Sequence, residues 1–192
     1  SLERQTPEGR LIPLLPILSL FFAHWGRALR FESWSTVLIL FGAWLSLHCG
    51  TMWLNALLDQ DQGEILFGEA CTVPQATGIA AYLGLFVAVI LSALLGLIPL
   101  LLTTICAGLA ILYSHSRSRW KAHSLGGPFV NVIGYGVCSP LIGWWVAGVT
   151  VNLRTMAVLG TIPPFVLGCY LIAQSFQGDE DRERGYKTLV VT

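Results

Sequence analysis

The sequence alternates long apolar stretches with short polar segments. Four stretches contain no Asp, Glu, Lys or Arg, and they cover residues 33–58, 70–116, 122–153 and 155–178. A helix needs about 20 mostly apolar residues to cross the hydrocarbon core of a bilayer. Each of the four stretches is long enough, and together they exceed what the core of one soluble domain requires. The pattern therefore predicts an integral membrane protein that crosses the bilayer several times.

Six membrane-spanning helices fit this pattern, within a single domain that covers residues 1–192. They are predicted at residues 11–29, 33–58, 76–95, 98–113, 127–147 and 156–176. Gly96 and Pro99 favour a tight turn between the third and fourth helices, and Pro163-Pro164 favours a bend in the sixth. The predicted fold class is all-α, a multi-helix transmembrane bundle surrounded by lipid.

The composition narrows the function classes. Charged residues make up 11% of the chain, against about 25% in an average soluble domain. The formal net charge is zero, which argues against a nucleic-acid partner, since such a partner requires a basic face. The four histidines and five cysteines show no ligand-like spacing, so a metal site built from these residues is not expected.

The basic residues predict the orientation. With six spans, both termini and the loops after the second and fourth helices lie on one side of the membrane. That side carries Arg4, Arg10, Arg117, Arg119, Lys121, Arg182, Arg184 and Lys187, and the other side carries Arg27, Arg30 and Arg154. The positive-inside rule then places the first group, with the N-terminus, in the cytoplasm. The expected location is a bacterial inner membrane or an equivalent membrane.

The acidic residues gather on the same side. Ten of the eleven lie there, and eight form two clusters directly after the second and sixth helices. The clusters are Asp59, Asp61, Glu64 and Glu69, and then Asp179, Glu180, Asp181 and Glu183. Carboxylates are ligands for Mg²⁺, and a basic loop between them could bind phosphate. The pattern favours a site for a metal and an anion, with ordinary polar loops that cap helices as the alternative.

Three segments resemble motifs of one family. Residues 54–64, LNALLDQDQGE, resemble the first aspartate-rich motif, NDxxDxxxD, of the UbiA superfamily of intramembrane prenyltransferases. Residues 177–189, QGDEDRERGYKTL, are similar to its second motif, DxxxDxxxGxxTL. Residues 113–121, YSHSRSRWK, followed by Leu125-Gly126, resemble the basic loop between them. The resemblance extends over essentially the whole chain, although six helices are visible here out of the family's usual nine. The chain is then either a fragment or a shortened member whose cavity another subunit completes.

The resemblance implies an activity and a set of site residues. The activity is the Mg²⁺-dependent transfer of a prenyl group from a prenyl diphosphate to a lipid-soluble acceptor, such as a quinone-precursor ring or a chlorophyllide. The implied catalytic residues are Asp59 and Asp181. The implied metal ligands are Asn55, Asp59, Asp61, Asp179 and Asp181. The residues expected to bind the diphosphate are Tyr113, Arg117, Arg119, Lys121 and Lys187.

The chain also departs from the family pattern. Ala56, Gly63 and Gln177 occupy positions where the motifs have Asp. Asp61 and Asp179 lie one or two residues from lost positions and could replace them. These departures leave a second function open, in which a catalytically degenerate member serves as a structural or pigment- or lipid-binding subunit of a larger membrane complex. A channel is less well supported because the charged residues lie at the ends of the predicted helices.

Overall fold

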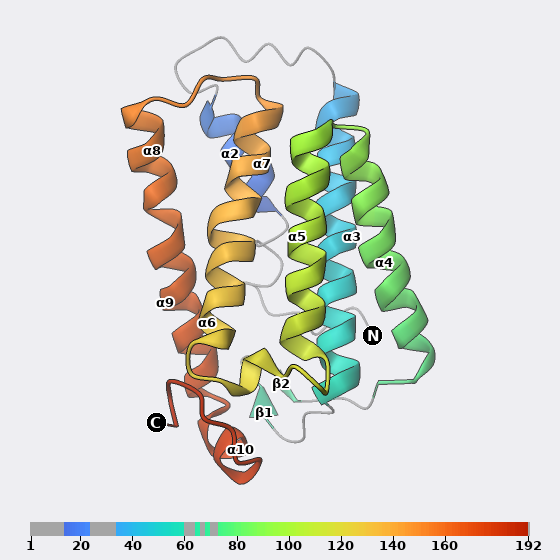
Figure 1. The fold of residues 1–192 in the computed structure, drawn as a ribbon, viewed down its shortest axis with the longest axis vertical. Helices are drawn as coiled ribbons and strands as arrows, with labels where there is room; N and C mark the ends of the chain where they lie inside the picture. Colours follow the sequence, from blue (N-terminus) through green and yellow to red (C-terminus); the bar gives the residue numbers. More distant parts are fainter. Residues whose placement is uncertain (1–13, 24–33, 60–63, 66–67, 70–72, 192) are drawn as a thin grey trace.

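The computed structural model describes residues 14–23, 34–59, 64–65, 68–69 and 73–191. Figure 1 shows a bundle of helices that run along one common axis, with their connections at the two ends. The helices are α2 (Leu15–Ala23), α3 (Trp34–Asp59), α4 (Ala76–Ala93), α5 (Leu97–Ser114), the 3₁₀-helix η3 (Trp120–Ala122), α6 (Gly126–Asn131), the π-helix η4 (Val132–Cys138), α7 (Ser139–Val146), α8 (Leu153–Gly160), α9 (Ile162–Ser175) and α10 (Gly178–Glu183). Two short antiparallel strands, β1 (Glu64–Ile65) and β2 (Gly68–Glu69), form a hairpin after α3.

The helices confirm the all-α membrane fold. Five segments of the described chain are long and apolar enough to cross a bilayer: Trp34–Leu58, Ala76–Ala93, Leu97–Ser114, Gly126–Val146 and Leu153–Ser175. They correspond to the second to sixth predicted spans. The first predicted span, residues 11–29, is represented by the nine-residue α2, and its remaining positions lie outside the described residues.

Two spans are less regular than the sequence predicts. The span predicted at residues 127–147 consists of α6, the π-helix η4 and α7, so its middle is wider than an α-helix. The span predicted at residues 156–176 breaks at Thr161, between α8 and α9. Pro163 and Pro164 lie in the first turn of α9, where the missing N–H of proline needs no partner. The bend therefore precedes the two prolines. Helix α10 lies in a polar tail for which no helix was predicted.

Small residues allow α3 and α4 to pack closely. A Cβ atom on Gly50 would lie 2.8 Å from the Ala81 carbonyl oxygen and 2.9 Å from the Leu85 nitrogen, and Gly84 meets the Ser46 carbonyl in the same contact. In lipid there is little hydrophobic driving force between helices, so such close packing is a main source of their association. Trp44 is fully buried in the core that these helices share with α5 and α7, which shows a packing role rather than an interfacial one.

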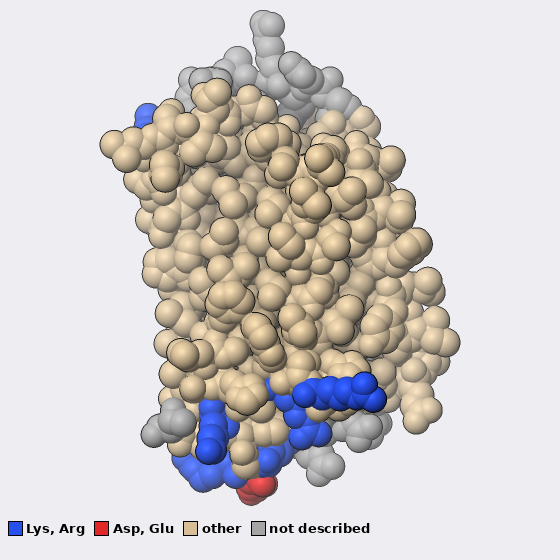
Figure 2. Space-filling model, in the orientation of Figure 1, with Lys and Arg blue, Asp and Glu red and all other residues tan. Residues whose placement is uncertain are grey.

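Charge and apolar surface are separated along the bundle. Large apolar side chains are exposed around its middle, for example Leu101 on α5 and Phe165 on α9, as expected for a surface in contact with lipid. Lys and Arg gather at the end that carries η3 and α10 (Figure 2). Of the seven described Lys and Arg residues, Arg154 alone lies at the opposite end. The predicted grouping of charge is thus confirmed for the described residues, whereas its cytoplasmic orientation stays a prediction.

Substitution of Gly50 by Ala tests the α3–α4 packing. The new methyl group would meet backbone atoms of α4, which cannot move aside as a side chain can, so we expect Gly50→Ala to lower the free energy of unfolding by about 1–3 kcal/mol. Gly108→Ala is the matched control, because nothing lies within 4 Å of a Cβ there, and we expect equal or slightly higher stability. Thermal unfolding of the purified chain in detergent measures both. An unchanged Tm for Gly50→Ala would contradict the close packing.

Candidate functional site at the basic end of the bundle

The loop after α5 folds over the end of the bundle through local hydrogen bonds. The Ser118 hydroxyl donates to the Leu112 carbonyl at 2.8 Å, and the Arg117 N–H donates to His115 Nδ1 at 3.2 Å. Arg119 has a left-handed backbone conformation, with φ of 41°, immediately before η3. These features turn the chain back toward the bundle, so that η3 places Lys121 on the inner side of the loop.

The polar tail after α9 returns to the same loop. Gly185 has a φ of +71°, a conformation that favours glycine, and it ends α10 in a turn whose Tyr186 N–H donates to the Asp181 carbonyl. The Lys187 N–H then donates to the Ala122 carbonyl at 3.0 Å, within a parallel bridge between His123 and Lys187. Backbone hydrogen bonds thus join the basic loop directly to the tail that carries the second acidic cluster.

Lys121 and Asp181 are the buried charges of this site. Lys121 is 7% exposed and Asp181 is 9% exposed. The Thr188 hydroxyl donates to Asp181 Oδ2 at 3.2 Å. Burial and, to a smaller extent, the nearby Arg184 lower the pKa of Lys121, the negative charge of Asp181 raises it, and the net result is a pKa of about 8. The loop and the tail therefore hold a cation and an anion within electrostatic reach of each other, largely out of water.

Residues at the ends of α3, α5 and α9 form the inner wall. The Ser114 hydroxyl donates to Asn55 Oδ1 at 3.2 Å and so connects α5 to α3. Gly127 leaves room for the Tyr170 hydroxyl of α9, and Gly126 lies against the Trp120 carbonyl, so a side chain at either position would collide with its neighbour. Gly126, in the Leu-Gly sequence after the basic loop, thus allows η3 to approach α6, and Gly127 does the same for α9.

The other predicted site residues are placed differently. Asp179 is 98% exposed at its side chain and forms an ion pair with Arg182 at 2.7 Å, separate from the buried Lys121 and Asp181. Arg117, Arg119 and Lys187 are exposed at the same end. Asp59 is the last residue of α3, with its backbone alone described, and Asp61 lies outside the described residues.

The donor chemistry of the site suits a hard cation. Asn55, Asp179 and Asp181 offer oxygen atoms, which are the ligands that Mg²⁺ prefers. Among the described residues, however, no three His, Cys, Asp or Glu side chains lie close enough together to hold a metal ion. The described part of the second acidic cluster is thus not a complete metal site, and oxygen donors from the first cluster would be needed as well.

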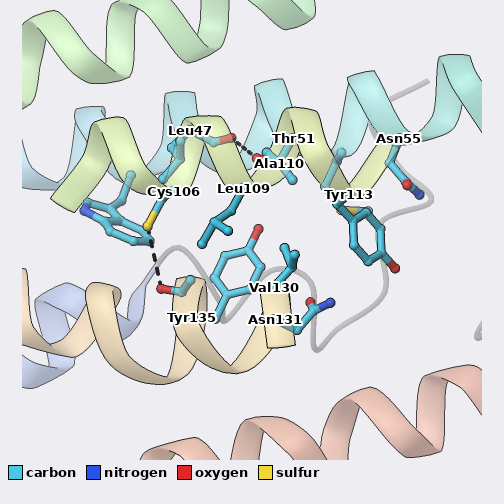
Figure 3. Close-up of a pocket in the computed structure, with 13 residues that line it drawn as sticks. Leu47, Thr51, Asn55, Cys106, Leu109, Ala110, Tyr113, Val130, Asn131 and Tyr135 are labelled. Atoms are coloured by element: carbon cyan, nitrogen blue, oxygen red, sulfur yellow. Dashed lines mark hydrogen bonds between the residues drawn. The ribbon is translucent and has the colours of Figure 1, made fainter. Parts of the chain in front are cut away.

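A cavity of about 130 Å³ extends from this end into the bundle (Figure 3). Asn55 and Tyr113 lie at its outer end, and it continues along α3 past Thr51 and Leu47 to Trp44. Sequence reasoning missed the polar wall of this cavity, which includes Thr51, Asn131 and Tyr135. The available signal was the polar series His48, Thr51 and Asn55, whose spacing of three and four residues places all three on one face of a helix.

Comparisons with known proteins identify the family and the fold. A family model described as the UbiA prenyltransferase family matches residues 14–192. No curated protein shows significant similarity to the chain. A UbiA homolog from Archaeoglobus fulgidus bound to DMAPP and Mg²⁺ has a TM-score of 0.78 at 16% identity, over 96% of this chain and 66% of that one. Structures of a UbiA homolog from the same organism, one bound to Cd²⁺ and one described without a ligand, have TM-scores of 0.71 at 16% and 14% identity. The chain covers 65% and 64% of their lengths, so it spans just under two thirds of these relatives.

The charges around Lys121 predict how its pKa responds to substitution. Asp181→Asn removes the charge that favours the protonated amine, so we expect the pKa of Lys121 to fall below about 8. Arg184→Gln removes a repelling charge, so we expect the pKa to rise. The measurement is an NMR titration of the Lys121 ¹³Cε resonance in labelled protein. Shifts of the same sign in both variants would contradict the arrangement of the three charges.

Proposed function

Since the chain belongs to the UbiA prenyltransferase family, we propose that it binds a prenyl diphosphate at its basic end and transfers the prenyl group to a lipid-soluble acceptor. The observation that carries this proposal is the junction of the basic loop with the acidic tail. It buries Lys121 near Asp181 at one end of a bundle whose other surfaces are largely apolar. A molecule with a polyanionic head and an apolar body matches that division of charge.

The basic residues would act on the leaving group. In the transfer, the C–O bond between the allylic carbon and the diphosphate breaks, the allylic carbon forms a bond to the acceptor, and the acceptor releases a proton. Negative charge then develops on the diphosphate, and fixed cations at that position lower the barrier. Lys121 is buried, whereas Arg117, Arg119 and Lys187 are exposed at the same end of the bundle, and Tyr113 lies at the end of α5 that leads into the basic loop. The apolar bundle would keep water away from the allylic cation.

The acidic segments would supply the metal ligands. Asp59 and Asp181, with Asn55, Asp61 and Asp179 as further oxygen donors, would hold Mg²⁺, which neutralises charge on the diphosphate when it is bound. A diphosphate and bare carboxylates repel each other, so binding should depend on the metal. The acceptor would be a quinone-precursor ring, a chlorophyllide or a similar apolar nucleophile, and we propose that the basic end faces the cytoplasm.

A second candidate function is binding without transfer, as a structural or lipid-binding subunit of a membrane complex. Specific observations favour it: Asp179 is engaged by Arg182, Asp181 is engaged by Thr188, and Gln177 replaces an acidic motif residue. In this case prenyl or pigment lipids would bind, and no diphosphate would be released.

Removal of either central carboxylate tests the enzyme proposal. We expect Asp59→Asn and Asp181→Asn each to weaken Mg²⁺-dependent binding of a labelled prenyl diphosphate and to reduce diphosphate release about 100-fold, because each substitution removes one negative charge from the metal-binding end. Glu183→Gln is the matched control, since it makes the same change on an exposed side chain of α10 and should have little effect. Wild-type binding without diphosphate release would favour the second candidate. Absence of Mg²⁺-dependent binding by the wild type would contradict the first.

The pH dependence of binding tests the role of Lys121. The amine is protonated below a pKa of about 8 and neutral above it, and a diphosphate binds the protonated form, so affinity should fall as the pH rises through 8. Loss of one charge-assisted contact corresponds to about tenfold in affinity. Lys121→Met should bind weakly at every pH and lack this step. Lys187→Met, in which an exposed lysine is removed, should retain it. The measurement is the Kd of a labelled prenyl diphosphate between pH 7 and 9, and a wild-type Kd that does not change with pH would contradict the assignment.

A further inference from the structure

The cavity inside the bundle has a polar middle section. Thr51 on α3, Asn131 on α6 and Tyr135 on the π-helix η4 line it, between apolar residues such as Leu109 and Val130. Figure 3 shows the Tyr135 ring projecting from η4 into the space between the helices, with its hydroxyl directed toward α5 and α3. An isoprenoid tail offers no group that can pair with these side chains, so the lining points to a different ligand.

The Tyr135 hydroxyl is where the polar groups converge. His48 Nδ1 lies 3.4 Å from it, and the two rings meet edge to face with their centroids 6.1 Å apart. The Thr51 hydroxyl, one turn further along α3, donates to the Leu47 carbonyl at 2.8 Å. Helix α3 thus positions the Tyr135 hydroxyl through His48.

Burial of these polar side chains at this depth in the bundle is energetically unfavourable. His48 is 2% exposed and lies near the middle of the span Trp34–Leu58, where lipid surrounds the helices. Ionisable and polar side chains at this depth are rare and are usually functional. Tyr135 belongs to a π-helical segment, an irregularity that frequently occurs at functional sites. Packing alone would be served at lower cost by apolar side chains.

The size of the cavity restricts the ligand. A cavity of about 150 Å³ in another protein holds a molecule of benzene, and this one measures about 130 Å³. Trp44 lines it on the same face of α3, two turns beyond Thr51, and is 0% exposed, so it closes the inner end. This volume corresponds to about one six-membered ring and is small for a chain of several isoprene units.

We propose that this cavity is a binding site for a small ligand, about one ring in size, whose hydroxyl or carbonyl group pairs with the Tyr135 hydroxyl. Tyr135 contacts the ligand, and His48 is a positioning residue that acts through Tyr135. The identification of this ligand as the acceptor rests on the proposed function. The site itself is inferred from the geometry of the cavity. A longer prenyl tail would then lie outside the cavity, against lipid.

The test uses two probes that differ by one hydroxyl, 4-fluorophenol and fluorobenzene. Binding to the chain in lipid nanodiscs is followed by ¹⁹F NMR, with empty nanodiscs as the reference for partition into lipid. We expect the wild type to prefer 4-fluorophenol by about three- to tenfold, as one hydrogen bond provides. Tyr135→Phe keeps the ring and should abolish the preference without changing the affinity for fluorobenzene. Tyr82→Phe, at a 48% exposed tyrosine on α4, is the matched control and should keep the preference.

The positioning role of His48 has its own readout. His48→Leu should reduce the preference for 4-fluorophenol, and His48→Asn, which retains a hydrogen-bonding group near the position of Nδ1, should restore part of it. Equal binding of the two probes by the wild type would overturn the proposal, and so would a preference that survives in Tyr135→Phe or an equal loss of both probes in that variant. Prenyl diphosphate binding is measured on the same samples. Retained diphosphate binding without probe selectivity would refute the cavity site alone, whereas probe selectivity without diphosphate binding would refute the proposed function alone.

Discussion

Hydrocarbon provides no hydrogen-bond partner for a peptide group, and the rest of this structure depends on that constraint. The spans of the described chain are helical, apart from the break at Thr161, so most of their backbone groups pair within a helix, and the described charged side chains lie toward the two ends. Because lipid is as apolar as the helices, association depends on close contact. That dependence explains why Gly50 and Gly84 lie where α3 meets α4. The exposed apolar side chains of the middle section are then the normal surface of the molecule.

The basic end of the bundle lies next to water, so the free energy required to bury a charge is lower there than in the middle of the bundle. Lys121 and Asp181 lie under a loop and a tail that are joined through the Lys187–Ala122 hydrogen bond. Burial makes the ammonium group of Lys121 easier to deprotonate, and Asp181 partly offsets this effect. A protonated, poorly hydrated amine can bind a polyanion strongly because it has little water to lose. The exposed arginines at the same end add positive charge at the surface.

The cavity between α3, α5 and η4 places polar side chains inside the apolar part of the bundle. Inside an apolar bundle, His48, Thr51 and Tyr135 can be accommodated because they hydrogen-bond to one another or to the backbone. A ligand that enters must match the remaining polar capacity or leave it unsatisfied, so such a pocket discriminates by chemistry as well as by size. The site at the basic end and the polar cavity share Asn55 and Tyr113, which links the two environments along α3 and α5.

Much of this molecule could be predicted from the order of its residues. Spans two to six, the grouping of the basic residues at one end and the family all depend on local composition or on short motifs, which tertiary contacts do not change. The sequence also indicated that the basic loop and the acidic tail belong to one site. It did not indicate that Lys121 would be buried while Arg119, two residues earlier, is exposed, because that difference arises from the left-handed turn at Arg119 and from the tail that pairs with Ala122. The separation of Asp179 from Asp181, the π-helix that carries Tyr135 and the meeting of Tyr135 with His48 were likewise decided by the tertiary structure. Each depends on packing between residues that are distant in the chain; His48 and Tyr135, for example, are 87 positions apart. The periodicity along one helix carries no information about which helices pack against it.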